Sequence, residues 1–154
     1  MKRRGLFLGI LAVALLAMPS RAGLDVAKLR PVQTLWVSVA SEGIVLRTES
    51  GNVGVGADFA AALADMEAAS ASRIFYQTAE YLLVTREALT QIDQASKFLR
   101  PSCVLCLTEG EPVLDLAAQF LEEHGAKTTL QQHRADGRKL PVLMTREGRM
   151  NLVP

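Results

Sequence analysis

Three glycines form the most chemically suggestive pattern in this sequence. Gly51, Gly54 and Gly56 precede a helix-like run in the segment SGNVGVGADFAAALADM. A glycine-rich loop between a strand and a helix often holds a phosphate. The dinucleotide fingerprint, however, needs glycines at relative positions one, three and six, whereas these occupy positions one, four and six. The P-loop needs a lysine and then Ser or Thr after its last glycine, and here Ala57 and Asp58 follow.

The first residue of the predicted helix also opposes phosphate binding. We expect the Asp58 carboxylate to cap the helix by accepting hydrogen bonds from the free N–H groups of its first turn. The carboxylate then occupies the place of a phosphate and repels an anion. The glycines are therefore expected to form a turn and a tight entry into the helix, with no nucleotide and no cofactor bound.

Cys103 and Cys106 form a CxxC pair, which in an exported protein suggests a thiol–disulfide centre. Such a centre places its first cysteine at a helix N-terminus, where the thiol pKa falls. The neighbours Val104, Leu105 and Leu107 instead indicate a strand, on which residues three apart point to opposite faces. We expect two buried, unreactive thiols, and the alternative is a redox pair.

Other catalytic patterns are missing from the sequence. It has no HExxH motif and no serine in a nucleophile elbow. His124 and His133 are not at metal-ligand spacing and lie in polar segments, so no metal site is expected. The acidic residues Asp93 and Asp115 belong to polar helix faces. The sequence therefore predicts a protein that is not an enzyme.

The segments that position these residues alternate between strand and helix patterns. The predicted elements are strands at 32–40, 44–49 and 53–55, a helix at 59–69, strands at 73–77 and 81–85, a helix at 86–99, a strand at 102–108, a helix at 111–125, and strands at 129–134, 139–145 and 149–153. The order predicts an α/β fold whose mixed β-sheet is covered by about three helices, with an N-terminal antiparallel meander and a C-terminal hairpin.

Local signals refine these elements. Asp136-Gly137 and Glu147-Gly148 predict hairpin turns, and Pro141 places its strand at a sheet edge or at a bulge. The third helix should bury one stripe of residues. That stripe consists of Val113, Leu116, Ala117, Phe120 and Leu121.

The N-terminus reads as an export signal. Lys2, Arg3 and Arg4 precede an uncharged run from Gly5 to Met18, and Ser20-Arg21-Ala22 offers a cleavage site. The run is shorter than the roughly 20 residues of a spanning helix, so the protein is expected to be secreted or extracytoplasmic, with anchoring by an uncleaved signal as the alternative.

Without residues 1–22 the chain has 13 basic and 16 acidic residues, a net charge of −3. This charge argues against nucleic acid or an anionic membrane surface as the main partner.

The middle of the chain resembles a known family. Residues 56–110 (GADFAAALADMEAASASRIFYQTAEYLLVTREALTQIDQASKFLRPSCVLCLTEG) resemble the N-terminal domain of the Ger(x)C proteins, the C subunit of spore germinant receptors. The matching positions are Gly56, Ala61 to Leu63, Ile74-Phe75, Leu82 to Val84 and Phe98-Leu99-Arg100. The tail 140–153 resembles the start of the family's next domain.

The resemblance implies a domain without established catalytic residues that takes part in sporulation or germination. The family is normally lipidated at a cysteine after its signal and carries further domains, whereas this chain has no cysteine before Cys103. The expected relative is therefore free-standing and non-lipidated. Its expected organisation is a signal peptide at 1–22, a Ger(x)C N-terminal-like domain at 23–138, and a C-terminal hairpin or truncated start of a second domain at 139–154.

A protein-binding surface is the expected functional site. If the 139–154 hairpin lacks the domain that follows it in the family, apolar surface near Val142, Met144 and Leu152 stays uncovered at a sheet edge. We expect this edge to bind a partner protein at or near the membrane, or a second copy of the chain, as opposed to a closed monomer whose hairpin only caps the core. The alternatives are an extracytoplasmic thiol–disulfide protein that uses Cys103 and Cys106, and a structural component of the spore envelope.

Overall fold

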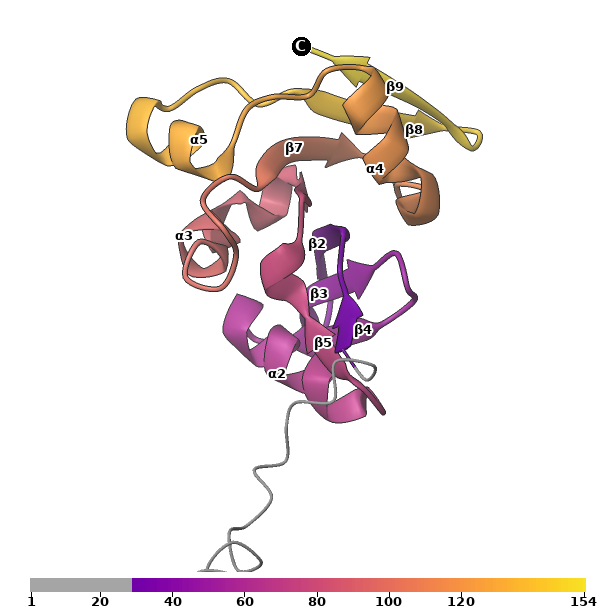
Figure 1. The fold of residues 1–154 in the computed structure, drawn as a ribbon, viewed down its shortest axis with the longest axis vertical. Coiled ribbons are helices and arrows are strands. Elements are labelled where there is room, and N and C mark those ends of the chain that lie inside the picture. Colours follow the sequence, from indigo (N-terminus) through magenta and orange to yellow (C-terminus); the bar gives the residue numbers. More distant parts are fainter. Residues whose placement is uncertain (1–28) are drawn as a thin grey trace, which may run out of the picture.

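A seven-stranded mixed sheet organises the computed structural model, which describes residues 29–154 (Figure 1). Its strand order is β4-β3-β2-β6-β7-β8-β9. The predicted export signal lies outside the described residues. The strands are β1 (Leu29–Pro31), β2 (Thr34–Ala40), β3 (Gly43–Thr48), β4 (Val53–Gly56), β5 (Arg73–Phe75), β6 (Tyr81–Thr85), β7 (Val104–Glu109), β8 (Val142–Arg146) and β9 (Arg149–Val153). The helices are α2 (Phe59–Ala69), α3 (Ile92–Ala95), α4 (Leu114–Glu123) and α5 (Leu130–Asp136), with 3-10 turns η2 (Tyr76–Thr78) and η3 (Arg86–Gln91).

The N-terminal part confirms the predicted meander. Strands β2, β3 and β4 pair antiparallel in sequence order. Ile44, Leu46 and Thr48 alternate on the buried face of β3, as their spacing predicts. The prediction that Asp58 caps the following helix is also confirmed, since its carboxylate accepts from the Ala61 N–H at 2.9 Å.

Parallel pairing builds the centre of the sheet. Strand β6 lies between β2 and β7 and is parallel to both, and β7 is parallel to β8. Such a sheet needs apolar residues on both faces, which explains the uninterrupted runs YLLV and VLCL. The short strands β1 and β5 pair parallel in a separate two-stranded sheet, which the sequence analysis did not predict.

Two predicted elements differ from the structure. The helix predicted over 86–99 is instead the 3-10 turn η3 followed by the single helical turn α3. The strand predicted at 129–134 is helix α5, so Asp136-Gly137 is not a hairpin turn. The Thr129 hydroxyl and the Gln132 side chain form a capping box at the start of α5. Gly137 ends the helix with a left-handed φ of 61°.

The C-terminal hairpin is present, but its strand order corrects one prediction. Strands β8 and β9 pair antiparallel through the turn at Glu147 and Gly148. Strand β8, which follows Pro141, is not an edge strand, because it also pairs with β7. Pro141 precedes the strand, where its missing N–H is tolerated, and its carbonyl accepts from the Leu107 N–H at 2.9 Å. The edge strand at this end of the sheet is β9, and β4 is the edge strand at the other end.

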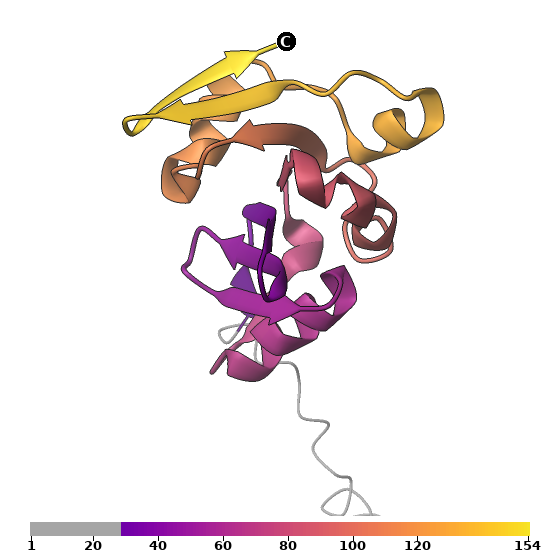
Figure 2. The same ribbon diagram turned by 180° about the vertical axis from the view of Figure 1, so that it is seen from behind.

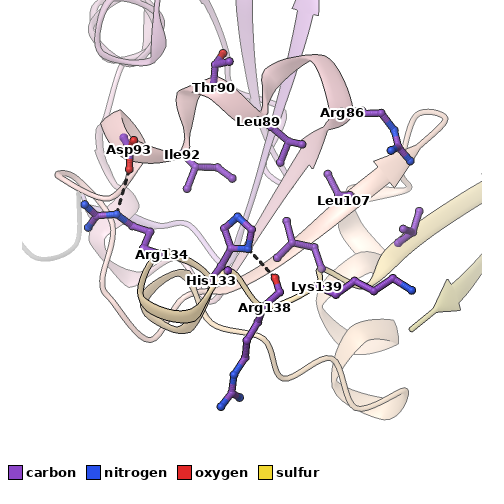
Figure 3. A pocket seen from close by; sticks show the side chains of 13 residues that line it. Arg86, Leu89, Thr90, Ile92, Asp93, Leu107, His133, Arg134, Arg138 and Lys139 are labelled. Carbon is purple, nitrogen blue, oxygen red and sulfur yellow. Dashed lines mark hydrogen bonds and ion pairs between the residues drawn. The ribbon is translucent and has the colours of Figure 1, made fainter.

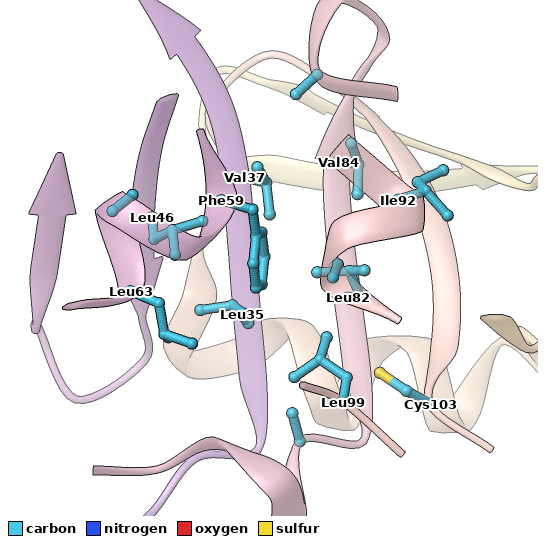
Figure 4. Close-up of a cluster of buried hydrophobic side chains, with 14 of the residues drawn as sticks. Leu35, Val37, Leu46, Phe59, Leu63, Leu82, Val84, Ile92, Leu99 and Cys103 are labelled. Carbon is cyan, nitrogen blue, oxygen red and sulfur yellow. The ribbon is translucent and has the colours of Figure 1, made fainter. Parts of the chain in front are cut away.

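The helices cover opposite faces at the two ends of the sheet (Figures 1 and 2). Helices α2 and α3 lie on one face and bury the major core, which includes Leu35, Leu46, Phe59 and Leu82 (Figure 4). Helix α4 lies on the other face and buries the minor core. The minor core consists of Trp36, Tyr81, Leu83, Cys106, Ala117, Ala118, Leu121 and Leu143.

Candidate functional site

The glycine segment is a packing device. A Cβ atom at Gly54 would lie 2.1 Å from the Ala62 carbonyl oxygen, and one at Gly56 would lie 2.3 Å from the Ala62 nitrogen. Glycines at both positions let strand β4 lie directly against the backbone of α2. Gly51 has a left-handed φ of 81° and forms the β3–β4 turn. These roles agree with the prediction of a turn and a tight helix entry.

Side chains of the protein itself occupy the N-terminus of α2. The Phe59 N–H donates to the Gln91 side-chain oxygen at 3.0 Å, and the Ala60 N–H donates to that of Gln94 at 3.4 Å. Asp58 accepts from Ala61, and this bond, together with one from the Gln94 amide, lowers the pKa of the Asp58 carboxyl. A phosphate at this helix end would have to displace all three side chains.

The two cysteines lie on opposite faces of the sheet, as the strand interpretation predicts. Cys103 belongs to the major core and Cys106 to the minor core, and both are free thiols with no exposed surface. Burial raises the pKa of each thiol to about 12. This environment is the opposite of the exposed, electropositive one that activates a redox cysteine.

Both histidines make local contacts. His124 stacks on Phe120 with ring centroids 3.9 Å apart, and its Nδ1 lies 2.8 Å from the Phe120 carbonyl oxygen. His133 Nδ1 lies 2.8 Å from the carbonyl oxygen of Arg138 and helps to fold the chain after α5. In the described part, no group of three or more His, Cys, Asp or Glu side chains is arranged to hold a metal ion.

The residues of the predicted partner-binding edge divide between two faces. Val142 and Met144 are half-buried and lie on one face of β8, opposite Val153 and Asn151 of β9. Leu152 lies opposite Leu143 on the other face and packs against the minor core. The structure thus brings Val142 and Met144 together and separates Leu152 from them.

An incompletely covered sheet surface surrounds Val142 and Met144. We call it the open face and define it by Leu107, Val142, Met144 and Val153, which share one side of β7–β8–β9. Val153 is 39% exposed, and neither Val142 nor Met144 belongs to either core. Helix α4 packs behind these strands, on the opposite side. The open face therefore ends at β9, whose outer backbone has no partner strand among residues 29–154.

Two arginines flank the open face. Arg146 and Arg149 pair directly across β8 and β9, on the same side as Val142 and Met144, and both are exposed. Like charges in directly opposed positions of a sheet destabilise it. No carboxylate of the described residues lies within 4.0 Å of either guanidinium. The two exposed positive charges therefore lie side by side with no carboxylate of residues 29–154 to offset them.

A hollow that no sequence pattern predicted overlaps the open face at Leu107 and Val142 (Figure 3). We call it the basic hollow; its volume is about 620 Å³, and it lies between η3, α3, β7 and the α5–β8 connection. Leu89, Ile92, Leu107, Leu140 and Val142 contribute its apolar wall. Its charged lining residues are Arg86, Arg134, Arg138, Lys139 and Asp93. These residues come from four separate segments, and only the adjacent Arg138-Lys139 pair is a local signal in the sequence.

Comparisons of the chain with protein-family models, with curated proteins and with solved structures find no match. Among residues 29–154, no helix has the length and apolar content needed to cross a bilayer.

Proposed function

We propose that this chain is a non-enzymatic, extracytoplasmic binding module that accepts an acidic, extended segment of a partner protein along β9. The observation that carries the proposal is the open face, a half-buried apolar strip that ends at β9, an edge strand that within residues 29–154 is paired with β8 on one side only. An added strand would satisfy the outer backbone groups of β9 and would cover Val153. Alternate side chains of that strand would lie on the open face.

Charge complementarity defines the partner as acidic. Carboxylates on the added strand would lie near Arg146 and Arg149, whose mutual repulsion they would relieve. Such contacts are exposed, so we expect them to raise the association rate more than the affinity. We also expect binding to weaken as the salt concentration rises.

The setting of this function rests on sequence patterns. The export-like N-terminus supports a location outside the cytoplasm, and the resemblance to the N-terminal domain of Ger(x)C proteins supports a role in sporulation or germination, near the membrane. The buried thiols and the occupied α2 N-terminus favour a binding function over thiol chemistry or nucleotide binding.

Self-association is a second candidate, because β9 is complementary to itself. An antiparallel pair of β9 strands centred on Asn151 places Arg149 opposite Val153 of the second copy, and Met150 opposite its Leu152. This register avoids the arginine–arginine contact that exists within each hairpin. A structural role in the spore envelope would use this same contact.

A peptide titration tests the proposal. An alternating Glu-Val peptide should bind and should shift backbone amide resonances of β9, whereas an alternating Lys-Val peptide should not. The double variant Arg146→Glu, Arg149→Glu should reverse this preference. Lys97→Glu is the matched control, because it reverses an exposed cation in the turn after α3 and should leave binding unchanged.

Three results would contradict the proposal. The first is equal binding of the two peptides, and the second is amide shifts confined to another edge of the sheet. The third is an acidic-peptide affinity that does not change in the arginine double variant. Sedimentation of the free protein tests self-association: a dimer that Asn151→Lys dissociates supports the second candidate, and a monomer at high concentration excludes it.

A further inference from the structure

The basic hollow shares Leu107 and Val142 with the open face, but its charged residues do not belong to that face, and it carries an inference that does not require a strand added to β9. We propose that it binds an amphipathic organic anion, meaning a small molecule with an apolar body and one carboxylate or phosphate. Its volume of about 620 Å³ lies within the range of small-molecule sites. The argument rests on its apolar wall, its charge and the geometry of its arginines.

The wall of the hollow suits an apolar body. Leu89 and Leu107 are half-buried and point into the space between η3 and β7 (Figure 3). Ile92 and Leu140 are buried behind them and belong to the major core. The exposed parts of Leu89 and Leu107 form a patch that a methylene chain or a ring can cover, which removes both surfaces from water.

The charge of the hollow selects an anion. Residues 29–154 contain 12 basic and 15 acidic residues, a net charge of −3. The lining of the hollow has the opposite sign, with four cations against the single carboxylate of Asp93. A concentration of positive charge on an acidic protein directs anions to that place.

The existing ion pairs leave donors free for a ligand. Arg134 contacts Asp93 through Nε at 3.2 Å, and Arg138 contacts Asp136 through Nε at 3.7 Å. A guanidinium has five N–H groups, so pairing through Nε leaves its terminal amino groups available. Arg86 contacts Glu109 at 3.5 Å, and the side chains in all three pairs are about half exposed or more. Exposed pairs of this kind are weak, and a ligand carboxylate can compete with them.

The geometry also separates the two parts of the ligand. Figure 3 shows Arg86, Arg134 and Arg138 spread around the rim, whereas Leu89, Ile92 and Leu107 lie between them. The anionic group is therefore expected at the rim near α5, with the apolar body directed toward β7. Because the rim is open to solvent, affinity should depend on both parts of the molecule.

Calorimetry with decanoate below its micelle concentration tests this inference on the full chain. Decanoate should bind, and decyltrimethylammonium, with the same tail and opposite charge, should not. Shortening the acid should weaken binding by up to about fourfold per methylene. Arg138→Gln should weaken decanoate binding about tenfold, since it removes a charged donor at the rim. Arg149→Gln is the matched control, because it removes a cation outside the hollow and should change affinity less than twofold.

Several outcomes would overturn the inference. They are no decanoate binding, equal binding of the cationic detergent, equal binding of butyrate, and an unchanged affinity in an Arg138→Gln protein that melts like the wild type. A vesicle-binding measurement distinguishes a lipid surface from a free ligand. If the protein binds phosphatidylglycerol vesicles but not decanoate, the hollow is not a binding site for a free anion and the inference is overturned. The arginine double variant Arg146→Glu, Arg149→Glu keeps the hollow intact, so failure of the peptide test and failure of the decanoate test can be told apart.

Discussion

Thiol labelling gives the sharpest test of how the sheet buries Cys103 and Cys106. Burial raises the pKa of each thiol from 9.0 to about 12. Near pH 8, about one free thiol in ten is a thiolate, whereas a thiol with the raised pKa is a thiolate in about one case in ten thousand. Because the thiolate is the reacting form, labelling of the native protein should be at least about a thousandfold slower than labelling in denaturant.

The assay follows a chromogenic disulfide reagent in native buffer and in concentrated guanidinium. Cys103→Ala and Cys106→Ala leave one thiol each and assign the two rates to the two faces of the sheet. A native rate within tenfold of the denatured rate, in a protein with unchanged circular dichroism, would refute the reasoning. So would an intramolecular disulfide that forms without unfolding.

The same pKa shifts predict the alkaline stability of the protein. Each thiol binds its proton more tightly in the folded state, so its contribution to stability is complete below pH 9.0 and is lost as the pH rises toward 12. In that window each thiol should lower the free energy of unfolding by up to about 1.4 kcal/mol per pH unit. Replacing either cysteine with Ala should make this decline shallower, and denaturant titrations from neutral to alkaline pH measure the slope.

Three further perturbations follow from other parts of the fold. Gly54→Ala should destabilise the protein by about 3 kcal/mol, since the added Cβ would collide with the backbone of α2. Gly51→Ala has open space around it but a left-handed φ, so it should cost only about 1–2 kcal/mol. Urea titrations measure both costs, and equal values would contradict the packing argument. Asp58→Ala should lower the melting temperature without creating affinity for ATP. Because the pKa of Asp58 is lowered in the folded protein, the stability difference between wild type and variant should shrink as the pH falls below 3.8. Micromolar ATP binding in calorimetry would refute the conclusion that protein side chains occupy the α2 N-terminus. Thr108→Val should lower the free energy of unfolding by about 1–3 kcal/mol, because the buried Trp36 Nε1–H loses the Thr108 hydroxyl, its acceptor at 3.2 Å. Unchanged Trp36 fluorescence emission together with unchanged stability would argue against this hydrogen bond.

Strong local signals made the first half of the chain predictable. The alternation of Ile44, Leu46 and Thr48 gives the buried face of β3, and Asp58 marks the start of α2. Both features depend on residues close in sequence, which a single chain reveals. The uninterrupted apolar runs of β6 and β7 likewise indicate strands with two buried faces.

Sequence reasoning failed where periodicity was weak. Only Leu130 of α5 is buried, so the helix has no apolar stripe, and an Asp-Gly pair after a strand-like run suggested a hairpin. The better signal was Thr129 followed three residues later by Gln132, the pattern of a capping box. In α4 the predicted stripe is confirmed at Ala117 and Leu121, which are buried, but wrong at Leu116, which is 55% exposed. It also missed Ala118, which is buried.

The candidate sites depend on topology more than on local pattern. The open face exists because α4 packs behind β7–β8–β9, a choice of side that strand periodicity leaves undetermined. The basic hollow joins Arg86 to Arg134 and Arg138, which are far apart in sequence. No local spacing rule connects such residues, so only the crossover connections of the fold reveal their neighbourhood.

The parallel pairing of β2 with β6 has a consequence for how the chain folds. One side of β2 meets β3 through a short turn, but its other side pairs with β6, which follows only after the meander, α2 and β5. Closing such a distant contact is slow compared with forming a hairpin. The meander and α2 should therefore assemble first, leaving the apolar strand that carries Leu35, Trp36 and Val37 temporarily exposed along its backbone. During that interval an unpaired β2 is a template for other chains, and any condition that delays β6 should favour aggregation over folding.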